Sequence, residues 1–473
     1  MRICLILVLC VTLNTYAQDS TLYFNASVML SGASGQTPFW VYANQYGSVP
    51  RDGNFGLAKA GLYKIYNPNN PRTFQWIGGV EAVGSYGRKY DNLFVSDAYL
   101  GAKVGAVEIL AGQKSMIAGL TDTLMSSGSL AVSGNARPIP RIQIAIPEYL
   151  PLYITDGLLA IKASYSDGYL GSSRINYGSV RQVDRTYFHQ KTLYLRFGKN
   201  IDRWKGYLGF NHQVIWGGEK DIMPLYNMPG SKAYWYMATG KTFEHRKVGN
   251  HFGTIDLGGE WKGKKWEYFV YRQNIYETGS LFRVINLKDG LNGLRIRKSG
   301  KTGAESSRLD VRSLLIEVVV TESQQNGSPA GGLAIYEKGN YYNHYIYRNG
   351  WSYKGQGMGT PLAPAAGITR SDLPRNTGEF TNNNRFLAFH TGVEAIWHHT
   401  LIRFKGTYSR NSGTFLSPFE DVKQQLSLAL SAEKSFKKLR GVSIYSTISS
   451  DIGRLYSNSS GILVGLRKNG FLD

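Results

Sequence analysis

Two stretches of this sequence combine the side chains that proteins use to bind sugars. Aromatic rings stack on the apolar faces of sugars, and basic side chains pair with acidic sugar groups. One stretch centres on Trp235, which lies between two tyrosines and near Lys232 and Lys241. The other contains Tyr341, Tyr342, Arg348, Trp351, Tyr353 and Lys354. We predict a carbohydrate-binding surface at these residues; the alternative is that their rings pack the loops against the rest of the protein.

The sequence offers few groups for catalysis. It contains no H-E-x-x-H and no G-x-S-x-G motif. The neighbours His398 and His399 would point to opposite faces of a strand, which is a poor arrangement for sharing a metal ion. Glu219 and Asp221 are the best candidates for the carboxylate pair of a glycan hydrolase, but charged residues in a loop usually face solvent. We therefore expect no enzyme, no cofactor and no metal site.

The first 17 residues have the features of a secretory signal peptide. The segment begins with Arg2, continues with an apolar run and ends on the small residue Ala17. Both cysteines of the chain lie in this segment, so residues 18–473 have no thiol for a disulfide framework or a cysteine nucleophile. We expect residues 18–473 to form a single domain.

The formal net charge of the chain is +21. A secreted chain does not meet nucleic acid, so the expected anionic partners are the phosphates of lipopolysaccharide and acidic polysaccharides. Beyond the signal peptide, no apolar run approaches the roughly 18 residues of a membrane helix. A membrane location would therefore require strands, and we expect a monomer.

Alternation of apolar and polar residues predicts an all-β protein. In Gln424–Glu433, three leucines at every second position alternate with glutamine and serine. The same period occurs in Phe94–Val104, Gly157–Tyr165, Thr192–Phe197, Tyr207–Trp216, Phe386–Trp397, Leu401–Tyr408, Gly441–Ser449 and Gly461–Arg467, and less clearly in Thr73–Tyr86, Thr254–Trp261, Trp266–Tyr276 and Leu309–Val320. These segments, with weaker ones, give roughly 16 to 18 strands. Soluble sandwiches or propellers and a transmembrane barrel both fit this number.

The distribution of tryptophans and loops favours the membrane barrel. Six tryptophans lie close to turn signals, as in an interfacial aromatic girdle: Trp76, Trp204, Trp216, Trp261, Trp266 and Trp397. Most predicted turns are short, but the loops near residues 217–250 and 325–384 are long. Long loops commonly carry function and face outward in outer-membrane barrels.

The stretch Gly112–Tyr153 fits neither a strand nor a solvated linker. Glycine, serine and proline interrupt any period, yet many of its residues are apolar and require burial. We predict that this stretch fills part of the barrel lumen. Its expected structural residues are Ser127, Asn135, Arg137, Pro138 and Pro140, with acids or carbonyl groups of the lumen binding Arg137 and the prolines stiffening the return.

Several motifs resemble the Wzi-like capsule-assembly family of outer-membrane proteins, in the branch typical of Bacteroidetes. They are Gly112-Gln113-Lys114-Ser115, Ser126-Ser127-Gly128-Ser129-Leu130, Asn135-Ala136-Arg137-Pro138-Ile139-Pro140, His212-Gln213-Val214-Ile215-Trp216-Gly217-Gly218, Tyr341-Tyr342-Asn343-His344-Tyr345 and Gly350-Trp351-Ser352-Tyr353-Lys354-Gly355. The resemblance covers most of residues 18–473.

The resemblance implies an 18-stranded outer-membrane β-barrel that retains capsular or extracellular polysaccharide by lectin-like binding, without catalysis. Known family members also carry a helical bundle near the N-terminus, whereas Asp19–Gly56 here is predicted as one strand and a loop. Two alternatives remain at this point. One is a porin-like diffusion channel, and the other is a glycan hydrolase.

Overall fold

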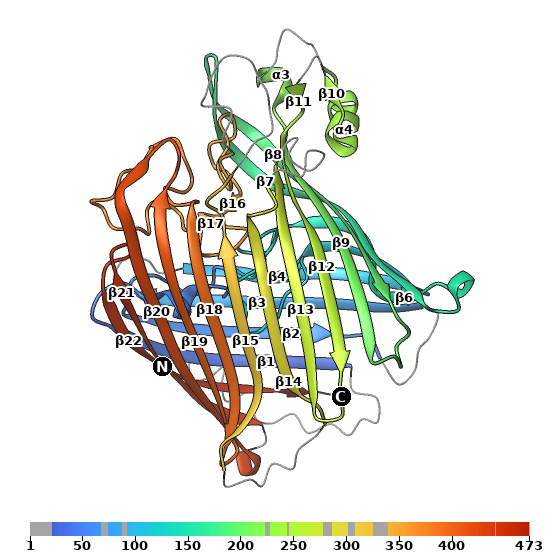
Figure 1. Ribbon diagram of the computed structural model, residues 1–473, viewed down its shortest axis with the longest axis vertical. Coiled ribbons are helices and arrows are strands. Elements are labelled where there is room, and N and C mark those ends of the chain that lie inside the picture. The colour runs from blue at the N-terminus through green and yellow to red at the C-terminus, as the bar shows by residue number, and fades with distance from the viewer. Residues whose placement is uncertain are drawn as a thin grey trace.

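The protein is a closed β-barrel (Figure 1). The computed structural model describes residues 21–67, 74–87, 92–222, 228–243, 246–277, 286–300, 308–324, 339–439 and 441–472. The predicted signal peptide lies outside these ranges. Eighteen strands form one antiparallel sheet, and the pairing of the first strand with the last closes it. This confirms the predicted all-β, 18-stranded outer-membrane barrel.

The barrel strands follow one another around the wall in chain order. They are β1 (Leu22–Ala33), β2 (Phe55–Lys64), β3 (Phe74–Gly87), β4 (Asn92–Val104), β5 (Val107–Gln113), β6 (Arg141–Pro151), β7 (Leu159–Tyr177), β8 (Val180–Phe197), β9 (Trp204–Trp216), β12 (Asn250–Lys262), β13 (Trp266–Glu277), β14 (Gly290–Lys298), β15 (Asp310–Val320), β18 (Phe386–Trp397), β19 (Thr400–Gly413), β20 (Pro418–Phe436), β21 (Val442–Gly453) and β22 (Ser459–Phe471). The strand predicted at Phe386–Trp397 has the same bounds as β18.

Small elements lie in the connections. They are the helices α2 (Phe39–Tyr42), α3 (Glu219–Ile222) and α4 (Gly230–Thr239), the 3-10 turns η1 (Tyr153–Thr155) and η4 (Lys437–Leu439), and the short strand pairs β10 (Thr242–Phe243) with β11 (Arg246–Lys247) and β16 (Ser352–Tyr353) with β17 (Gln356–Gly357). In the described part of the chain, each helix is too short or too polar to cross a membrane.

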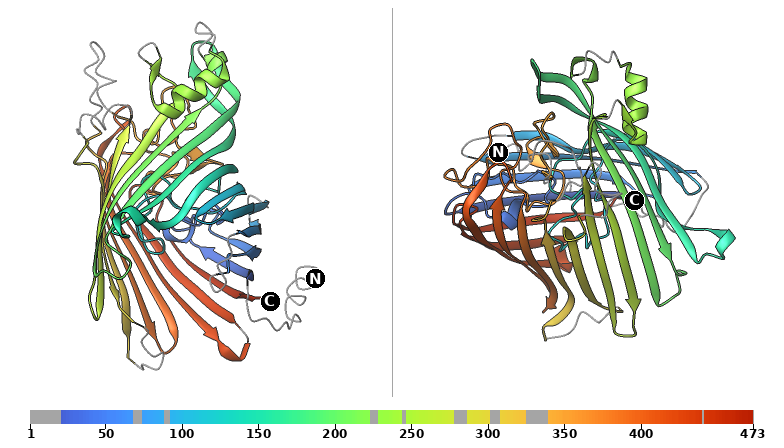
Figure 2. Two further views of the ribbon diagram at one scale, coloured as in Figure 1. Left: turned by 90° about the vertical axis from the view of Figure 1, so that its right-hand side faces the viewer. Right: turned by 45° about the horizontal axis from the view of Figure 1, so that its top comes forward.

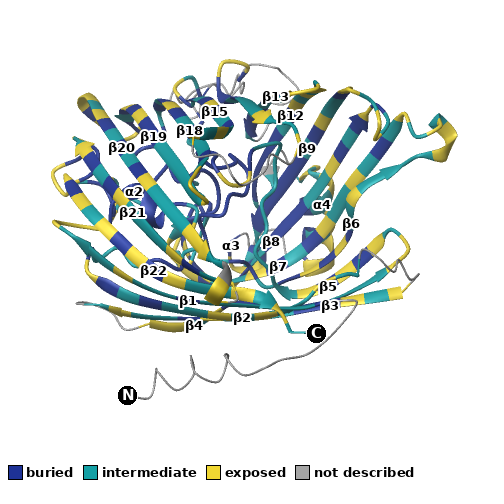
Figure 3. Ribbon diagram, turned by 90° about the horizontal axis from the view of Figure 1, so that it is seen from below, coloured by how far each residue is buried: buried dark blue, intermediate teal, exposed yellow. Residues whose placement is uncertain are grey.

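The wall is apolar outside and polar inside, which is the reverse of a soluble protein. In β20, Leu430 is 49% exposed, whereas Gln425 and Ser427 are buried. Ile448 of β21 is likewise exposed, while its neighbour Ser449 is buried. Exposed bands on the wall strands are visible from below in Figure 3. An apolar exterior on alternating residues is the pattern that lipid requires of a transmembrane barrel.

The two ends of the barrel differ. At one end, called the short-turn end, the connections between strands are short. Strand β1 begins and strand β22 ends there. The other end, called the long-loop end, carries residues 34–54, 114–140, 217–249 and 321–385. Strands β7 and β8 extend beyond the wall at this end (Figure 2). In outer-membrane barrels the short turns face the periplasm and the long loops face outward.

Five of the six predicted interfacial tryptophans lie at the short-turn end. They are Trp76, Trp204, Trp261, Trp266 and Trp397, and all are exposed on the outside of the wall. The rings of Trp204 and Trp261 lie 5.9 Å apart across paired strands. Trp216 lies instead at the long-loop end of β9. The five form the aromatic girdle expected at one membrane interface.

One local prediction was wrong, and the two adjacent histidines lie in a turn. His398 and His399 have positive φ and form the tight turn between β18 and β19, which is where the predicted strands Phe386–Trp397 and Leu401–Tyr408 leave them. The stretch Gly112–Tyr153 is not irregular throughout, since it begins with the end of β5 and contains β6. In β6 the register shifts between Ile146 and Leu150, where Pro147 lies, and this proline obscured the alternation.

Candidate functional site

Residues 114–140, called the lumen segment below, cross the interior of the barrel. Side chains from facing wall strands bond to the backbone of this segment. Asp256 of β12 accepts the Leu120 N–H at 2.8 Å, and Gln273 of β13 accepts the Leu130 N–H at 2.9 Å. His390 of β18 contacts the Met125 carbonyl at 2.6 Å. Buried backbone groups away from water need such partners, so the predicted lumen filling is confirmed.

Glu317 of β15 is a central attachment point of the lumen segment. Its side chain is fully buried, and its two carboxylate oxygens accept bonds from the Ser126 hydroxyl at 2.7 Å and the Ser127 N–H at 2.6 Å. The Tyr271 hydroxyl donates to the same carboxylate. Charge-assisted hydrogen bonds to buried groups are strong, so this contact fixes the depth of the segment in the lumen.

Two further connections fold inward and meet the lumen segment. From residues 339–385, the carbonyl of Gly357 accepts the Asn135 amide at 3.0 Å, and the Thr360 hydroxyl donates to the Ser127 carbonyl at 3.2 Å. From residues 34–54, the Tyr46 N–H donates to the Gly134 carbonyl at 2.6 Å. Ser127 and Asn135 therefore both bond to residues 339–385.

Arg137 differs from its predicted environment. Its guanidinium lies over the ring of Phe94 of β4, 3.4 Å from the centroid, rather than on acids or carbonyl groups. A cation over an aromatic face is an alternative way to stabilise a half-buried charge. Pro138 is buried, and the Pro140 carbonyl accepts the Tyr169 N–H of β7 at 2.9 Å just before β6 begins.

Three of the residues predicted to bind sugar are interior residues. Tyr341 and Trp351 are 0% exposed and Tyr342 is 2% exposed. The rings of Tyr342 and Trp351 each lie 5.4 Å from Phe252 of β12, and the Tyr342 hydroxyl donates to the Leu130 carbonyl at 3.0 Å. A ring without accessible surface cannot stack on a sugar. The prediction of direct contact is therefore wrong for these three residues, which pack residues 339–385 onto the wall and, through Tyr342, onto the lumen segment.

Trp351→Ala is expected to destabilise the barrel by about 3–5 kcal/mol, because it leaves a cavity beside Phe252. The free energy of unfolding in urea, measured on protein folded into lipid vesicles, tests this value. The control is Trp235→Ala, whose side chain is 58% exposed and whose loss should cost less than about 1 kcal/mol. Equal losses for the two variants would contradict the interior role of Trp351.

The remaining predicted residues lie at the long-loop end on two separate surfaces. Lys354 is exposed in the β16–β17 hairpin, and its ammonium lies 5.7 Å from the ring of the partly buried Tyr353. Arg348 is partly exposed beside β7, where Arg174 bonds to the neighbouring Asn349 at 3.2 Å. All three residues belong to the connection of residues 339–385, and each keeps some accessible surface.

Trp235 belongs to the second surface. It lies on α4, which packs through Ala233 and Met237 against Val214 on the outer side of β9. Lys191 donates to the Ala238 carbonyl in the last turn of the helix. Figure 1 shows α4 apart from β16 and β17. Trp235 therefore does not join the residues of the other predicted stretch.

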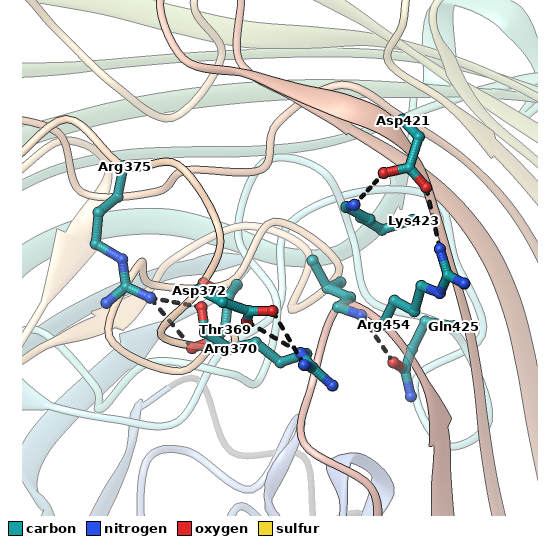
Figure 4. Close-up of polar contacts among 9 residues, drawn as sticks. Thr369, Arg370, Asp372, Arg375, Asp421, Lys423, Gln425 and Arg454 are labelled. Carbon is teal, nitrogen blue, oxygen red and sulfur yellow. Dashed lines mark hydrogen bonds and ion pairs between the residues drawn. The ribbon is translucent and has the colours of Figure 1, made fainter.

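A group of cations that the sequence patterns did not indicate lies beside the mouth of the barrel (Figure 4). We call Arg370, Arg375 and Arg454 the arginine ledge. Arg370 forms two 3.0 Å bonds to Asp372 and lowers the pKa of that carboxyl. Arg375 donates to the Arg370 carbonyl at 2.7 Å, and Arg454 contacts Asp421 at 3.2 Å. Arg370 and Arg375 have no aromatic residue near them in the sequence, and Arg454 has only Tyr456, so no cluster of aromatic and basic residues indicated this group.

The ledge joins two loops and keeps an excess of positive charge. The Arg370 N–H donates to the Leu455 carbonyl at 3.0 Å, so residues 339–385 and the β21–β22 connection are bound together. Lys423 also pairs with Asp421. Four cations thus face two carboxylates in this group. An exposed cationic surface of this kind attracts acidic polymers.

Glu219 and Asp221 do not form a catalytic pair. Glu219 is buried, and its carboxylate accepts the Gly217 N–H at 2.8 Å and the Tyr347 hydroxyl at 3.3 Å. Burial raises the pKa of Glu219 above its ordinary value, while these bonds lower it in part. Asp221 is exposed. Glu219 therefore connects α3 to residues 339–385, and the described residues contain no cluster of three or more potential metal ligands.

No protein-family model and no curated protein sequence matches this chain. Several solved structures match its fold. Wzi of Escherichia coli, described as an outer-membrane protein involved in group 1 capsule assembly and a carbohydrate-binding β-barrel, is 14% identical with a TM-score of 0.58, covering 95% of this chain and 85% of Wzi.

OccAB4 of Acinetobacter baumannii is 9% identical with a TM-score of 0.49, covering 96% of this chain and 99% of OccAB4. OccK5 of Pseudomonas aeruginosa is 8% identical with a TM-score of 0.48, covering 96% of this chain and 99% of OccK5. At these identities the likeness concerns the fold. The chain shares with Wzi the architecture of an 18-stranded outer-membrane β-barrel.

Proposed function

We propose that this protein is a non-catalytic outer-membrane barrel that retains capsular or extracellular polysaccharide at the cell surface. The observation that carries the proposal is the filled lumen. Three inward-folding connections bond to one another and to the wall, and connections held in this way favour a fixed loop surface over a wide open pore. The likeness of fold to Wzi, which is described as a carbohydrate-binding β-barrel, supports the same function.

The arginine ledge and the exposed part of residues 339–385 would be the binding surface. Arg348, Tyr353 and Lys354 contribute guanidinium, phenol and ammonium groups there, which suits a polymer with acidic sugars and hydroxyl groups. In this proposal the chain is a monomer in the outer membrane. Its outer wall contacts lipids and lipopolysaccharide, and Trp235 on α4 lies near that interface.

A diffusion channel is the second candidate. The lumen is not packed throughout, since a cavity lined by charged side chains such as Lys59, Arg403 and Arg467 remains on the side of the short-turn end. If the lumen segment moved, this space would become continuous with the mouth. These cations would then determine which neutral or acidic solutes pass through the barrel.

Polysaccharide retention and conductance separate the two candidates. Cells lacking the protein should release several-fold more extracellular polysaccharide into the medium, and the purified barrel should bind that polysaccharide in solution. In planar bilayers the intact barrel should show no large stable openings. Unchanged retention together with large stable openings would favour the channel and contradict the anchor.

A further inference from the structure

A cavity of about 490 Å³ lies in the lumen between the inward-folding segments and the short-turn end. Trp40 and Tyr46 of residues 34–54 and Ser115 of the lumen segment line it from the interior of the barrel. The surrounding wall consists of β1 to β4 and β19 to β22. The volume is within the range of about 300–1,000 Å³ that is usual for small-molecule sites.

The charged side chains of this cavity balance one another. Its cations are Lys59, Arg403 and Arg467, and its carboxylates are Glu81, Asp97 and Glu433. Most are already paired. Arg467 contacts Glu433 at 3.4 Å, and Asp97 accepts both the N–H and the hydroxyl of Ser115 at 2.7 and 3.0 Å. A site with equal numbers of both charges does not select a strongly charged ligand, but it offers donors and acceptors to a neutral polar one.

Aromatic rings accompany these polar groups. Tyr23, Tyr63 and Tyr445 line the cavity from the wall, whereas Trp40 is only 5% exposed and packs its ring against His390. The Tyr63 hydroxyl donates to Glu81 at 3.1 Å, so the position of that ring is fixed. Rings next to paired donors and acceptors match a sugar, which has apolar C–H faces and a rim of hydroxyl groups.

Three buried polar atoms of the lining residues have no hydrogen-bond partner among the described residues. They are the Asn25 side-chain oxygen, an acceptor, the Trp40 indole N–H, a donor, and the Tyr445 hydroxyl, a donor and acceptor. Such atoms are uncommon in folded proteins, because each one costs free energy unless it is satisfied. All three atoms belong to side chains that line the cavity.

We propose that this cavity binds a short neutral oligosaccharide that enters from the short-turn end. The site is separate from the surface of the proposed function, which lies at the opposite end and suits an acidic polymer. In an outer-membrane barrel the short-turn end faces the periplasm. The barrel would thus contact glycan on both sides of the membrane, with different chemistry on each.

Equilibrium dialysis of the full-length barrel in detergent tests the proposal. The neutral probes are maltotriose and N,N′-diacetylchitobiose, and the charged probes are glucuronate and inorganic phosphate. We expect saturable binding of at least one neutral probe and weaker binding of both charged ones. Absence of saturable binding by the neutral probes, or tighter binding of a charged probe, would overturn the proposal.

The variant Tyr445→Phe tests whether the neutral probe binds in this cavity. It removes a hydroxyl that has no described protein partner, so the fold should be unaffected, whereas affinity for the neutral probe should fall about five-fold. The matched control is Tyr149→Phe, because Arg196 lies over the Tyr149 ring at 5.5 Å as Arg467 lies over Tyr445 at 5.2 Å, and Tyr149 does not line the cavity. Equal affinities of the two variants would contradict the site.

Surface retention of polysaccharide distinguishes failure of this inference from failure of the proposed function. Cells that carry Tyr445→Phe should retain polysaccharide as the unmodified cells do, because the ledge is unchanged. Loss of retention in this variant would contradict the separation of the two sites.

Discussion

Replacing residues 117–135 by a short Gly-Ser linker is expected to raise the conductance of the barrel in planar bilayers by about ten-fold or more. An 18-stranded barrel without internal filling leaves an aqueous channel. The removed residues include those that bond to Asp256, Gln273 and Glu317 across the lumen. Heat-dependent migration on gels would show that the variant is folded before its conductance is compared.

A point variant tests the same idea with less change to the chain. Glu317→Ala removes the acceptor of the Ser126 hydroxyl and the Ser127 N–H, and losing charge-assisted bonds to buried donors costs about 1.5–3 kcal/mol. We expect brief openings in single-channel records. Glu394→Ala is the control, since that carboxylate pairs with Arg403 at 2.8 Å and should leave the lumen closed.

The outcome decides what the lumen segment does. A folded linker variant with no conductance would contradict its assignment as the constriction. In that case residues 34–54 and 339–385 would be the segments that close the lumen. Openings of equal size in Glu317→Ala and Glu394→Ala would show that wall carboxylates in general, not the lumen attachment, control conductance.

Changing the arginine ledge to glutamine at Arg370, Arg375 and Arg454 is expected to weaken binding of the cell's own acidic polysaccharide about ten-fold. Exposed ion pairs contribute about 0.5 kcal/mol each, and three together amount to about ten-fold in affinity. Binding to the unmodified barrel should also weaken as salt increases, because exposed charges are screened. Both effects are measured with purified barrel and isolated polysaccharide, and shedding into the medium is measured on cells.

The control removes the same charge from the opposite end. Lys264, Lys265 and Lys438 are exposed in connections at the short-turn end, and their replacement by glutamine should leave binding and retention unchanged. Equal weakening in the two triple variants would mean that net charge, rather than the ledge, attracts the polymer. No weakening in either would contradict the ledge as a polysaccharide surface.

The sequence by itself determined the wall of the barrel. Alternation in Gln424–Glu433 and Phe386–Trp397 was visible because neighbouring strand residues face opposite sides, and lipid on one side with polar lumen on the other preserves that contrast. Tryptophans close to turn signals indicated the aromatic girdle, and the spacing between predicted strands indicated the two long loops. Strand β6 was missed where Pro147 and the adjacent bulge interrupt the period.

Only the tertiary structure decided which loop residues face a ligand. Tyr341 and Trp351 have the composition of a sugar site, yet Phe252, distant in sequence, covers Trp351 and its neighbours. Arg137 likewise meets Phe94 of another strand. An aromatic or basic side chain in a loop can serve packing or binding equally well, because both use the same stacking and hydrogen-bonding chemistry. What separates them is the position of residues far along the chain, which local sequence does not specify.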